Sequence, residues 1–256
     1  MPKLEVVIST LNDGINDIDI SFVSGDYPLL IVHQISVFKI YDYSRFFNDN
    51  IRVVASKELG LSKSRNLAIK YAEADFILLS DDDMAYKATD LEQIYQCFEG
   101  GYDLVTFKIF NKFGQPFRCY PNINKNKNIL SYKFCSCEMA FRTSFIRKFN
   151  YDENFGLGAK YPAFEELILT HDILSSGIGL FYYCDEYLGL HFDCNHTGLN
   201  VTDKYCLAYG AFLKRTANKL FFIMILKFSL GNFFRNYDII KSFKIIYYSF
   251  FGYFKY

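Results

Sequence analysis

Three consecutive aspartates follow an apolar run and give the strongest chemical signal in the sequence. Asp81, Asp82 and Asp83 come directly after residues 76–79 and Ser80. They cannot all turn into a core, because an unpaired buried carboxylate costs several kcal/mol. Carboxylates at a strand end can converge on a hard cation such as Mg²⁺ or Mn²⁺, which would also hold phosphate oxygens. An acidic turn that caps the next helix explains the spacing equally well.

Two other segments carry charged groups at predicted helix starts. After Gly60, Lys63 and Arg65 fall in a first helical turn, where free N–H groups and an arginine fork would receive a diphosphate. Glu165 and Glu166 begin another helix, and adjacent helical acids point about 100° apart, so one would act as a base while the other positions it or binds substrate. The alternatives are a solvated first turn and a favourable acid placement at a helix N-terminus.

Histidines and cysteines add few candidates. His191 and His196 lie just past a predicted strand, where a histidine can complete the ligand shell of a divalent metal, although isolated histidines are more often structural. Cys135 and Cys137 are interpreted as two thiols on the same face of one strand, and no chemistry is assigned to them.

Apolar runs that alternate with helical patterns predict the elements that hold these groups. Strands are predicted at residues 4–8, 29–32, 51–55, 76–79 and 104–109. One helix is expected to begin at an N-cap Ser62, and another at a capping box of Thr89 and Glu92 that continues to Cys97. A polar loop at 114–128, a strand at 132–142, a helix at 164–175 and a strand at 180–184 follow. This order predicts an α/β fold: an open, mostly parallel sheet with helices on both faces and ligands beyond the carboxyl ends of its strands.

Composition narrows the class of protein. The chain has 256 residues, 28 Lys+Arg against 28 Asp+Glu, and 51% hydrophobic residues, which excludes intrinsic disorder and argues against nucleic acid as a partner. Seven cysteines without CxxC spacing suggest neither a disulfide framework nor a zinc ribbon. The start of the chain lacks the pattern of a signal peptide, and no uncharged apolar stretch reaches ~18 residues, so a cytoplasmic location is expected.

The last part of the chain differs in character from the rest. Residues 205–256 contain eight Lys or Arg against one acid, and seventeen of these 52 residues are Phe or Tyr. Apolar helical stretches at 219–227 and 243–251 are too short to span a bilayer but are rich in residues that settle at a membrane interface. We expect peripheral attachment to the inner face of the cytoplasmic membrane. Packing on the rest of the chain, or a homo-oligomer interface, is the alternative.

Taken in order, these segments resemble the family-two glycosyltransferases, which have the nucleotide-sugar-binding fold known as GT-A. The resemblance rests on residues 6–12, the Arg65-Asn66 pair that ends 61–66, the acidic 80–83, Glu165-Glu166, His191 and residues 208–215. It implies a catalytic domain at 1–202 and a helical C-terminal extension at 203–256.

The resemblance also implies roles for single residues. The implied nucleotide and diphosphate contacts are Thr10, Asn12, Gln34, Lys63, Arg65, Asp81 and Asp82. The implied metal ligands are Asp81, Asp83 and His191, with Asp81 and Asp83 as the acids of a DXD motif, although the run of three acids leaves the exact ligand open between Asp81, Asp82 and Asp83. Glu166 stands where the family usually has the Asp of a Glu-Asp pair that acts as general base, so the choice between Glu165 and Glu166 stays open. Gln34 replaces an acid near the base and ribose, and its amide suits a uracil edge.

The implied activity is that of an inverting, metal-dependent hexosyltransferase. The base would deprotonate an acceptor hydroxyl as it displaces a nucleoside diphosphate in one in-line step, with Mn²⁺ or Mg²⁺ as cofactor. A UDP-sugar is expected as donor and a lipid-linked glycan as acceptor, in bacterial O-antigen or capsule synthesis. The alternative is a catalytically silent nucleotide-sugar- or membrane-binding module on the same fold. A metal-dependent phosphotransferase is disfavoured because no nucleophile lies beside the acids.

Overall fold

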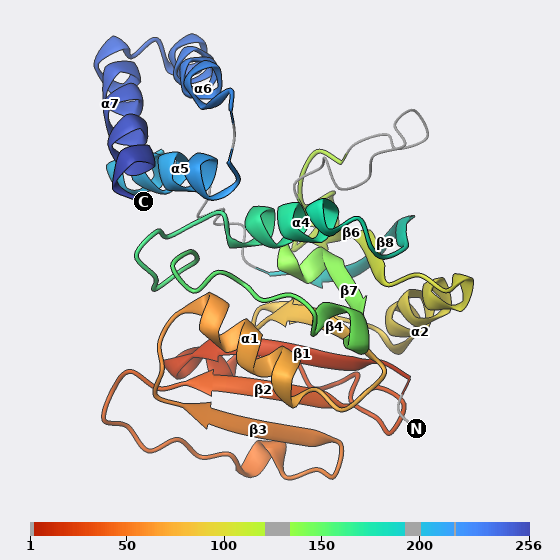
Figure 1. The fold of residues 1–256 in the computed structure, drawn as a ribbon. Coiled ribbons are helices and arrows are strands. Elements are labelled where there is room, and N and C mark those ends of the chain that lie inside the picture. The colour runs from red at the N-terminus through yellow and green to blue at the C-terminus, as the bar shows by residue number, and fades with distance from the viewer. Residues whose placement is uncertain (1–2, 121–133, 193–200, 218) are drawn as a thin grey trace.

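Eight strands of the described residues form one sheet, in the order β3-β2-β1-β4-β7-β6-β8-β5. The computed structural model describes residues 3–120, 134–192, 201–217 and 219–256 (Figure 1). The strands are β1 (Glu5–Leu11), β2 (Leu29–Gln34), β3 (Ile51–Ser56), β4 (Phe76–Asp81), β5 (Met84–Ala85), β6 (Leu104–Asn111), β7 (Met139–Arg142) and β8 (Phe181–His191). Strands β1 to β4 pair in parallel, as do β6 and β8, whereas β7 runs antiparallel to β4 and β6 and β5 runs antiparallel to β8. The predicted mostly parallel α/β sheet is confirmed.

Helices cover both faces of this sheet, as the strand pattern requires. The helices are α1 (Leu61–Tyr71), α2 (Ala88–Gln96), α3 (Thr143–Ile146), α4 (Glu165–Ser176), α5 (Asp203–Arg215), α6 (Phe221–Asn236) and α7 (Ile239–Lys255), with 3-10 turns η1 (Asn12–Asn16), η2 (Ser44–Phe46), η3 (Cys97–Gly100) and η6 (Ser136–Glu138). Val6 and Ile8 of β1 face a core shared with α2, whereas Val7 faces a core shared with α1 and α4. The alternation of side chains along a strand thus gives each face its own apolar layer.

Several element boundaries differ from the predictions. Helix α1 begins at Leu61, so Ser62 is not its N-cap, and α2 begins at Ala88, ahead of the predicted capping box. The strand predicted at 132–142 is shorter among the described residues: β7 begins at Met139, and the segment before it forms the turn η6. The assignment of Cys135 and Cys137 to one face of a strand was therefore wrong.

Helices α5 and α7 meet backbone to backbone at two glycines. A Cβ atom added to Gly210 would lie 1.9 Å from the carbonyl oxygen of Ser249, and one added to Gly252 would lie 2.1 Å from the carbonyl oxygen of Leu207. Both helices therefore need a residue without a side chain at the crossing, because any Cβ would force the backbones apart.

The pairing of α6 with α7 is unusual because small polar residues are buried and large apolar ones are exposed. Ser229 donates a hydrogen bond to the carbonyl oxygen of Ser242 at 2.9 Å, and Asn232 and Ser249 are buried as well. The exposed apolar side chains are Phe222, Ile223, Leu230, Phe234, Ile239, Ile240, Phe243, Tyr247, Phe251 and Phe254. This distribution is the reverse of a water-facing helix pair. Within the described part of the chain, none of the helices combines the length and the apolar character that a membrane crossing requires.

The glycine crossing predicts a sharp difference between glycines of the C-terminal helices. Gly210→Ala or Gly252→Ala should lower the free energy of unfolding by about 1–3 kcal/mol, the usual cost of overpacking. Gly231 lies in α6 with no atom within 4 Å of an added Cβ, so Gly231→Ala should be neutral or stabilise by up to ~1 kcal/mol through helix propensity. Thermal unfolding followed by circular dichroism measures this difference. Equal melting temperatures for the three variants would contradict the close crossing.

Candidate functional site

The carboxyl ends of β1, β2 and β4 bring predicted residues from distant segments to one edge of the sheet. Strand β1 lies between the other two, and its register pairs Ser9 with Asp81 and Thr10 with His33. The polar residues that end these three strands therefore lie beside each other, at the edge where open α/β sheets bind ligands.

Arg65 of α1 connects the three carboxylates of the site. It is 4% exposed. Its Nη1 donates to Glu166 Oε1 at 3.0 Å and to Glu165 Oε1 at 3.3 Å, while its Nη2 donates to Asp81 Oδ1 at 3.3 Å. Burial opposes the charge of Arg65, but the surrounding groups, with the Glu166 carboxylate foremost, raise its pKa well above the usual value. The diphosphate contact predicted for Arg65 stays a prediction; in the structure its guanidinium faces these acids.

The two adjacent glutamates share Arg65 but differ in environment. The Glu165 side chain is 7% exposed and that of Glu166 is 22% exposed. Burial, and then the neighbouring charge of Glu166, raise the pKa of Glu165 to about 8. Glu165 is therefore mostly protonated at neutral pH. Glu166 Oε1 accepts a second hydrogen bond from Ser136 Oγ at 3.1 Å, so Glu166 is the better exposed and the more firmly oriented carboxylate.

A glycine-bearing loop fixes the start of α1 against the start of α4. Ser62 Oγ donates to the carbonyl oxygen of Phe155 at 2.6 Å. Gly156 has φ of 104°, and a Cβ added there would lie 2.9 Å from Ser62 Oγ and 3.3 Å from Glu165 Cδ. Glycine is needed here both for the left-handed backbone and for the close approach. This packing holds Arg65 and the glutamates within hydrogen-bonding distance.

Asp82 is turned towards β1. Thr10 Oγ1 donates to Asp82 Oδ2 at 2.5 Å, and burial raises the pKa of Asp82. The backbone of Gly14 in η1 packs closely against the same pair, because a Cβ atom added to Gly14 would lie 2.3 Å from Asp82 Oδ2. Thr10 and Asp82, both predicted to contact the nucleotide or diphosphate, are thus hydrogen-bonded to each other.

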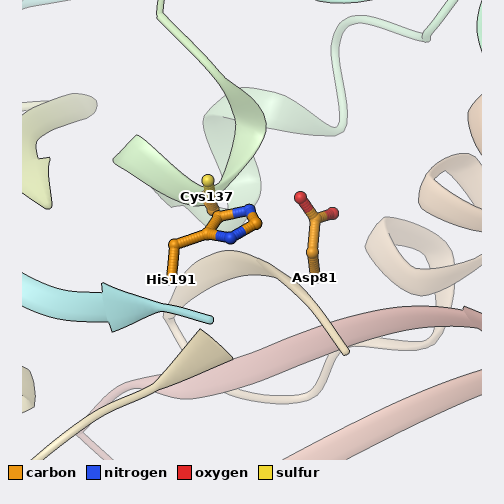
Figure 2. A group of neighbouring side chains, drawn as sticks. All are labelled: Asp81, Cys137 and His191. Carbon is orange, nitrogen blue, oxygen red and sulfur yellow. The ribbon is translucent and has the colours of Figure 1, made fainter. Parts of the chain in front are cut away.

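Asp81, Cys137 and His191 point towards one another (Figure 2). One potential ligand atom from each lies within 4.8 Å of the other two. His191 Nδ1 lies 3.3 Å from Asp83 Oδ2, but this buried nitrogen makes no hydrogen bond. Burial raises the pKa of Asp83, while the charge of His191 opposes that shift. The structure thus brings the predicted ligands Asp81, Asp83 and His191 together, and carboxylates beside an imidazole nitrogen without a partner fit a divalent cation. His196 lies outside the described residues.

The remaining predicted residues lie near this edge with partners of their own. Asn12 has φ of 51° and donates from its side chain to Ser36 Oγ at 2.7 Å. Gln34 Nε2 donates to the carbonyl oxygen of Glu58 at 2.5 Å, so its amide nitrogen is occupied by the loop before α1. Lys63 is half-exposed, with Nζ 4.0 Å from Glu58 Oε2.

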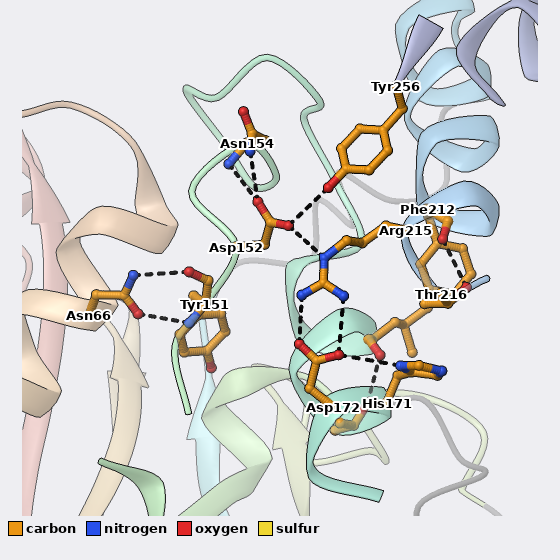
Figure 3. Close-up of polar contacts among 12 residues, drawn as sticks. Asn66, Tyr151, Asp152, Asn154, His171, Asp172, Phe212, Arg215, Thr216 and Tyr256 are labelled. Carbon is orange, nitrogen blue, oxygen red and sulfur yellow. Dashed lines mark hydrogen bonds and ion pairs between the residues drawn. The ribbon is translucent and has the colours of Figure 1, made fainter. Parts of the chain in front are cut away.

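Helix α5 is clamped to α4 through Arg215 (Figure 3). Arg215 Nε donates to Asp152 Oδ2 at 2.8 Å, and its Nη2 donates to Asp172 Oδ2 at 2.8 Å. Tyr256 also donates to Asp152 Oδ2, at 3.3 Å. Because Asp172 lies on α4, the helix that begins with Glu165 and Glu166, the C-terminal helices help to fix the orientation of that helix.

Phe164, the residue before the glutamate pair, has a strained backbone. Its φ of 79° is left-handed, a conformation that costs a bulky residue about 1–3 kcal/mol. The ring of Phe164 stacks on Phe212 of α5 at a centroid distance of 5.2 Å and lies 4.9 Å from the ring of Tyr205. Aromatic packing on α5 therefore offsets the strain at the first turn of α4.

Sequence reasoning missed two residues of the site, Ser136 and Cys137. Both lie on η6, where Glu138 accepts hydrogen bonds from Arg118 Nε at 2.9 Å and from Tyr120 Oη at 2.7 Å. Glu138 is fully buried, so these bonds fix the turn. The only available signal was an acid, Glu138, in an otherwise apolar segment.

Comparisons with known proteins agree with the predicted family. Residues 34–156 match the model of glycosyl transferase family 2. The structure resembles that of residues 1–349 of S. aureus TarS, with a TM-score of 0.61, 15% sequence identity, and coverage of 96% of this chain and 90% of that chain. TarS 1-349 in complex with UDP-GlcNAc gives a TM-score of 0.60 at 14% identity, with the same coverage of 96% and 90%. No similar sequence was found among the curated proteins. The predicted resemblance to the family-two glycosyltransferases and the predicted GT-A fold are confirmed.

The raised pKa of Glu165 predicts a pH dependence of stability. Its pKa rises from an ordinary 4.5 to about 8, so the native state holds a proton that the unfolded chain releases between these values. Stability from this group is present below pH 4.5 and is lost as the pH rises through about 8. In Glu165→Gln the decline in the free energy of unfolding across this window should be smaller, by up to about 5 kcal/mol at roughly 1.4 kcal/mol per pH unit.

Urea unfolding at a series of pH values measures that decline. Glu99→Gln serves as the control, because Glu99 is an exposed acid on η3, and this variant should follow the wild-type curve. A Glu165→Gln curve parallel to wild type would show that Glu165 is ionised throughout the window.

Proposed function

We propose, from the premise that the chain is a family-two glycosyltransferase, that it transfers a sugar from a UDP-sugar to a lipid-linked glycan with inversion at the anomeric carbon. The observation that carries this proposal is the convergence of Glu166, Arg65 and Asp81 at the carboxyl edge of the parallel strands. A UDP-sugar donor is supported by TarS, a protein of the same fold that has been crystallised with UDP and with UDP-GlcNAc. Residues 1–202 would form the catalytic domain and 203–256 its helical extension.

Glu166 would be the general base. Arg65 Nη1 and Ser136 Oγ both donate to its Oε1, which leaves the other carboxylate oxygen to receive a proton from the acceptor hydroxyl. The protonated Glu165 would fill space beside Arg65 and accept its hydrogen bond without a negative charge. The positive charge of Arg65 would then interact mainly with Glu166 and Asp81. General base catalysis of this kind contributes typically 10²–10⁴-fold.

A divalent ion, Mn²⁺ or Mg²⁺, would be held by Asp81, Asp83 and His191. Bound there, it would take up negative charge on the departing diphosphate, as metal sites commonly do. Lys63, half-exposed in the first turn of α1, would add a positive charge for the same phosphates, with Arg65 behind it. Asp82 would serve indirectly, since its hydrogen bond from Thr10 holds the acidic turn against β1.

The nucleoside would lie over the ends of β1 and β2. Thr10 and Asn12 follow one strand and Gln34 ends the other, and the amide oxygen of Gln34 would be the group available to the base, since its nitrogen binds the Glu58 carbonyl. The Gln34 amide, which stands where related proteins have an acid, would favour uracil by hydrogen bonding to the edge of that base.

The outer faces of α6 and α7 would lie on the inner leaflet of the cytoplasmic membrane. Support comes from their exposed apolar side chains together with six basic residues around them, Lys219, Lys227, Arg235, Lys241, Lys244 and Lys255. The contact between α6 and α7 through small polar residues, such as Ser229 with Ser242, is typical of helices that pack in apolar surroundings. Such attachment would bring the site to an acceptor that stays in the bilayer, as in O-antigen or capsule synthesis.

The adjacent glutamates offer a matched pair of variants that tests the base. Glu166→Gln should lower sugar transfer by about 10²–10⁴-fold, because it removes the proton acceptor without changing size. Glu165→Gln should keep most of the activity, because Glu165 is already protonated at neutral pH. Transfer from a panel of labelled UDP-sugars in the presence of Mn²⁺ measures both. Wild-type protein that binds UDP-sugars but never turns them over would favour the silent binding module.

Exposed aromatic residues allow the membrane proposal to be tested without truncation. The triple variant Phe234→Ser, Phe243→Ser and Phe254→Ser should weaken binding to vesicles that contain phosphatidylglycerol by at least about tenfold, because each ring would lose its apolar contact with lipid. Phe113→Ser removes a similarly exposed ring that follows β6 and is not part of α6 or α7, and this variant should bind as wild type does. Vesicle sedimentation measures the binding, which should also fall with salt. Unchanged sedimentation of the triple variant would reject this surface.

A further inference from the structure

Cys137 lies in the cluster of potential metal ligands although the expected ligand set contains only Asp81, Asp83 and His191. The Cys137 thiol, the Asp81 carboxylate and the His191 imidazole each offer an atom within 4.8 Å of the other two. Figure 2 shows the three side chains directed into the same space from η6, β4 and β8. Ligand atoms around one ion at about 2.0–2.3 Å lie roughly 3–4 Å apart, so about 1 Å of side-chain movement would close the set.

The turn η6, which carries Cys137, is held in place by a buried ion pair and several hydrogen bonds. The next residue, Glu138, is fully buried and bound by Arg118 through Nε at 2.9 Å and Nη2 at 2.5 Å. The same carboxylate accepts a hydrogen bond from the Cys135 backbone nitrogen at 3.0 Å. Burying an ion pair costs free energy unless all of its hydrogen-bonding groups are satisfied. We interpret the satisfied pair here as a means of fixing the backbone position of the neighbouring residues. One of those residues, Ser136, orients Glu166, and the other is Cys137.

His191 supplies a second, independent observation. Its ring is stacked on Phe117 at a centroid distance of 4.5 Å, which fixes the plane of the imidazole. Its Nδ1 is buried and makes no hydrogen bond, although Asp83 Oδ2 lies 3.3 Å away. A rigid imidazole whose buried nitrogen makes no hydrogen bond, next to a thiol and carboxylates, is a donor set for a transition metal.

We propose that Cys137 is a sulfur ligand of the divalent ion, together with Asp81 and His191. This inference rests on the metal dependence in the proposed function and adds a ligand to it. As the metal–sulfur bond forms, the thiol gives up its proton to water and the sulfur binds as thiolate. With Cys137 added, the set holds one sulfur and one nitrogen beside the carboxylate oxygens of Asp81 and Asp83, which favours Zn²⁺, Co²⁺ and Cd²⁺ over Mg²⁺, a cation that prefers oxygen ligands.

X-ray absorption at the zinc edge tests this on the unmodified 256-residue chain. With one equivalent of Zn²⁺, the expected result is one sulfur at about 2.3 Å beside nitrogen and oxygen at about 2.0–2.2 Å. A shell of nitrogen and oxygen alone overturns the assignment of Cys137 and leaves the glycosyltransferase function standing, because transfer with Mn²⁺ is measured separately. Failure to bind Zn²⁺ at all also overturns it.

Cobalt titration with a matched pair of cysteine variants provides the second measurement. The wild type should develop a near-ultraviolet thiolate-to-cobalt absorption band on addition of Co²⁺. Cys135→Ser, two residues away and outside the cluster, should keep the band, whereas Cys137→Ser should lose it. Circular dichroism shows whether each variant is folded. A band that persists in folded Cys137→Ser overturns the proposal, and if that variant does not fold, the zinc-edge result on the wild type decides.

Discussion

The pairing of one buried guanidinium with three carboxylates is the constraint on which the site depends. Arg65 is the common donor to Asp81, at the end of β4, and to the adjacent Glu165 and Glu166, at the start of α4 and far from Asp81 in sequence. Both Arg65 and Glu165 are buried, and the carboxylate of Glu166 lies beside them. Burial first, and then the charge of Glu166, raise the pKa of Glu165 to about 8, so Glu165 holds a proton at neutral pH. The site thus gives Glu165 a role different from that of the more exposed Glu166.

The surrounding fold acts mainly to bring these groups within reach of Arg65. Gly156 lets a loop approach Ser62 closely enough to set the start of α1 against the start of α4. The buried Glu138 fixes the turn η6 on the opposite side, where Ser136 reaches Glu166. On the sheet, β4 ends at Asp81 in register with β1. None of these contacts is apolar, yet each depends on the two apolar layers that hold the strands and helices together.

The sequence predicts the sheet well because its signals are local. Four apolar runs, separated from one another by polar segments, are the strands β1 to β4, and the acids at the end of the fourth mark the edge at which the site forms. Helix starts were less accurate: Gly60 precedes α1, where Ser62 was the expected cap, and Lys87 precedes α2 although lysine is not a typical N-cap residue. The role of η6 could not be read from the chain, because the partners of Glu138 are Arg118 and Tyr120, and only tertiary structure brings them together. The same holds for Arg65, whose partners Glu165 and Glu166 lie a hundred residues away.

The link between α5 and α4 limits how this protein could exchange parts with its relatives. A chimera that kept the sheet unit and received a foreign set of C-terminal helices would have to supply an arginine between Asp152 and Asp172, and aromatic rings for Phe164 to stack on. Without them, two acids would lose their counter-charge and a left-handed backbone would lose its support, immediately before the glutamate pair. An exchange of parts with relatives should therefore keep Asp152, Phe164, α4 and α5 from one parent.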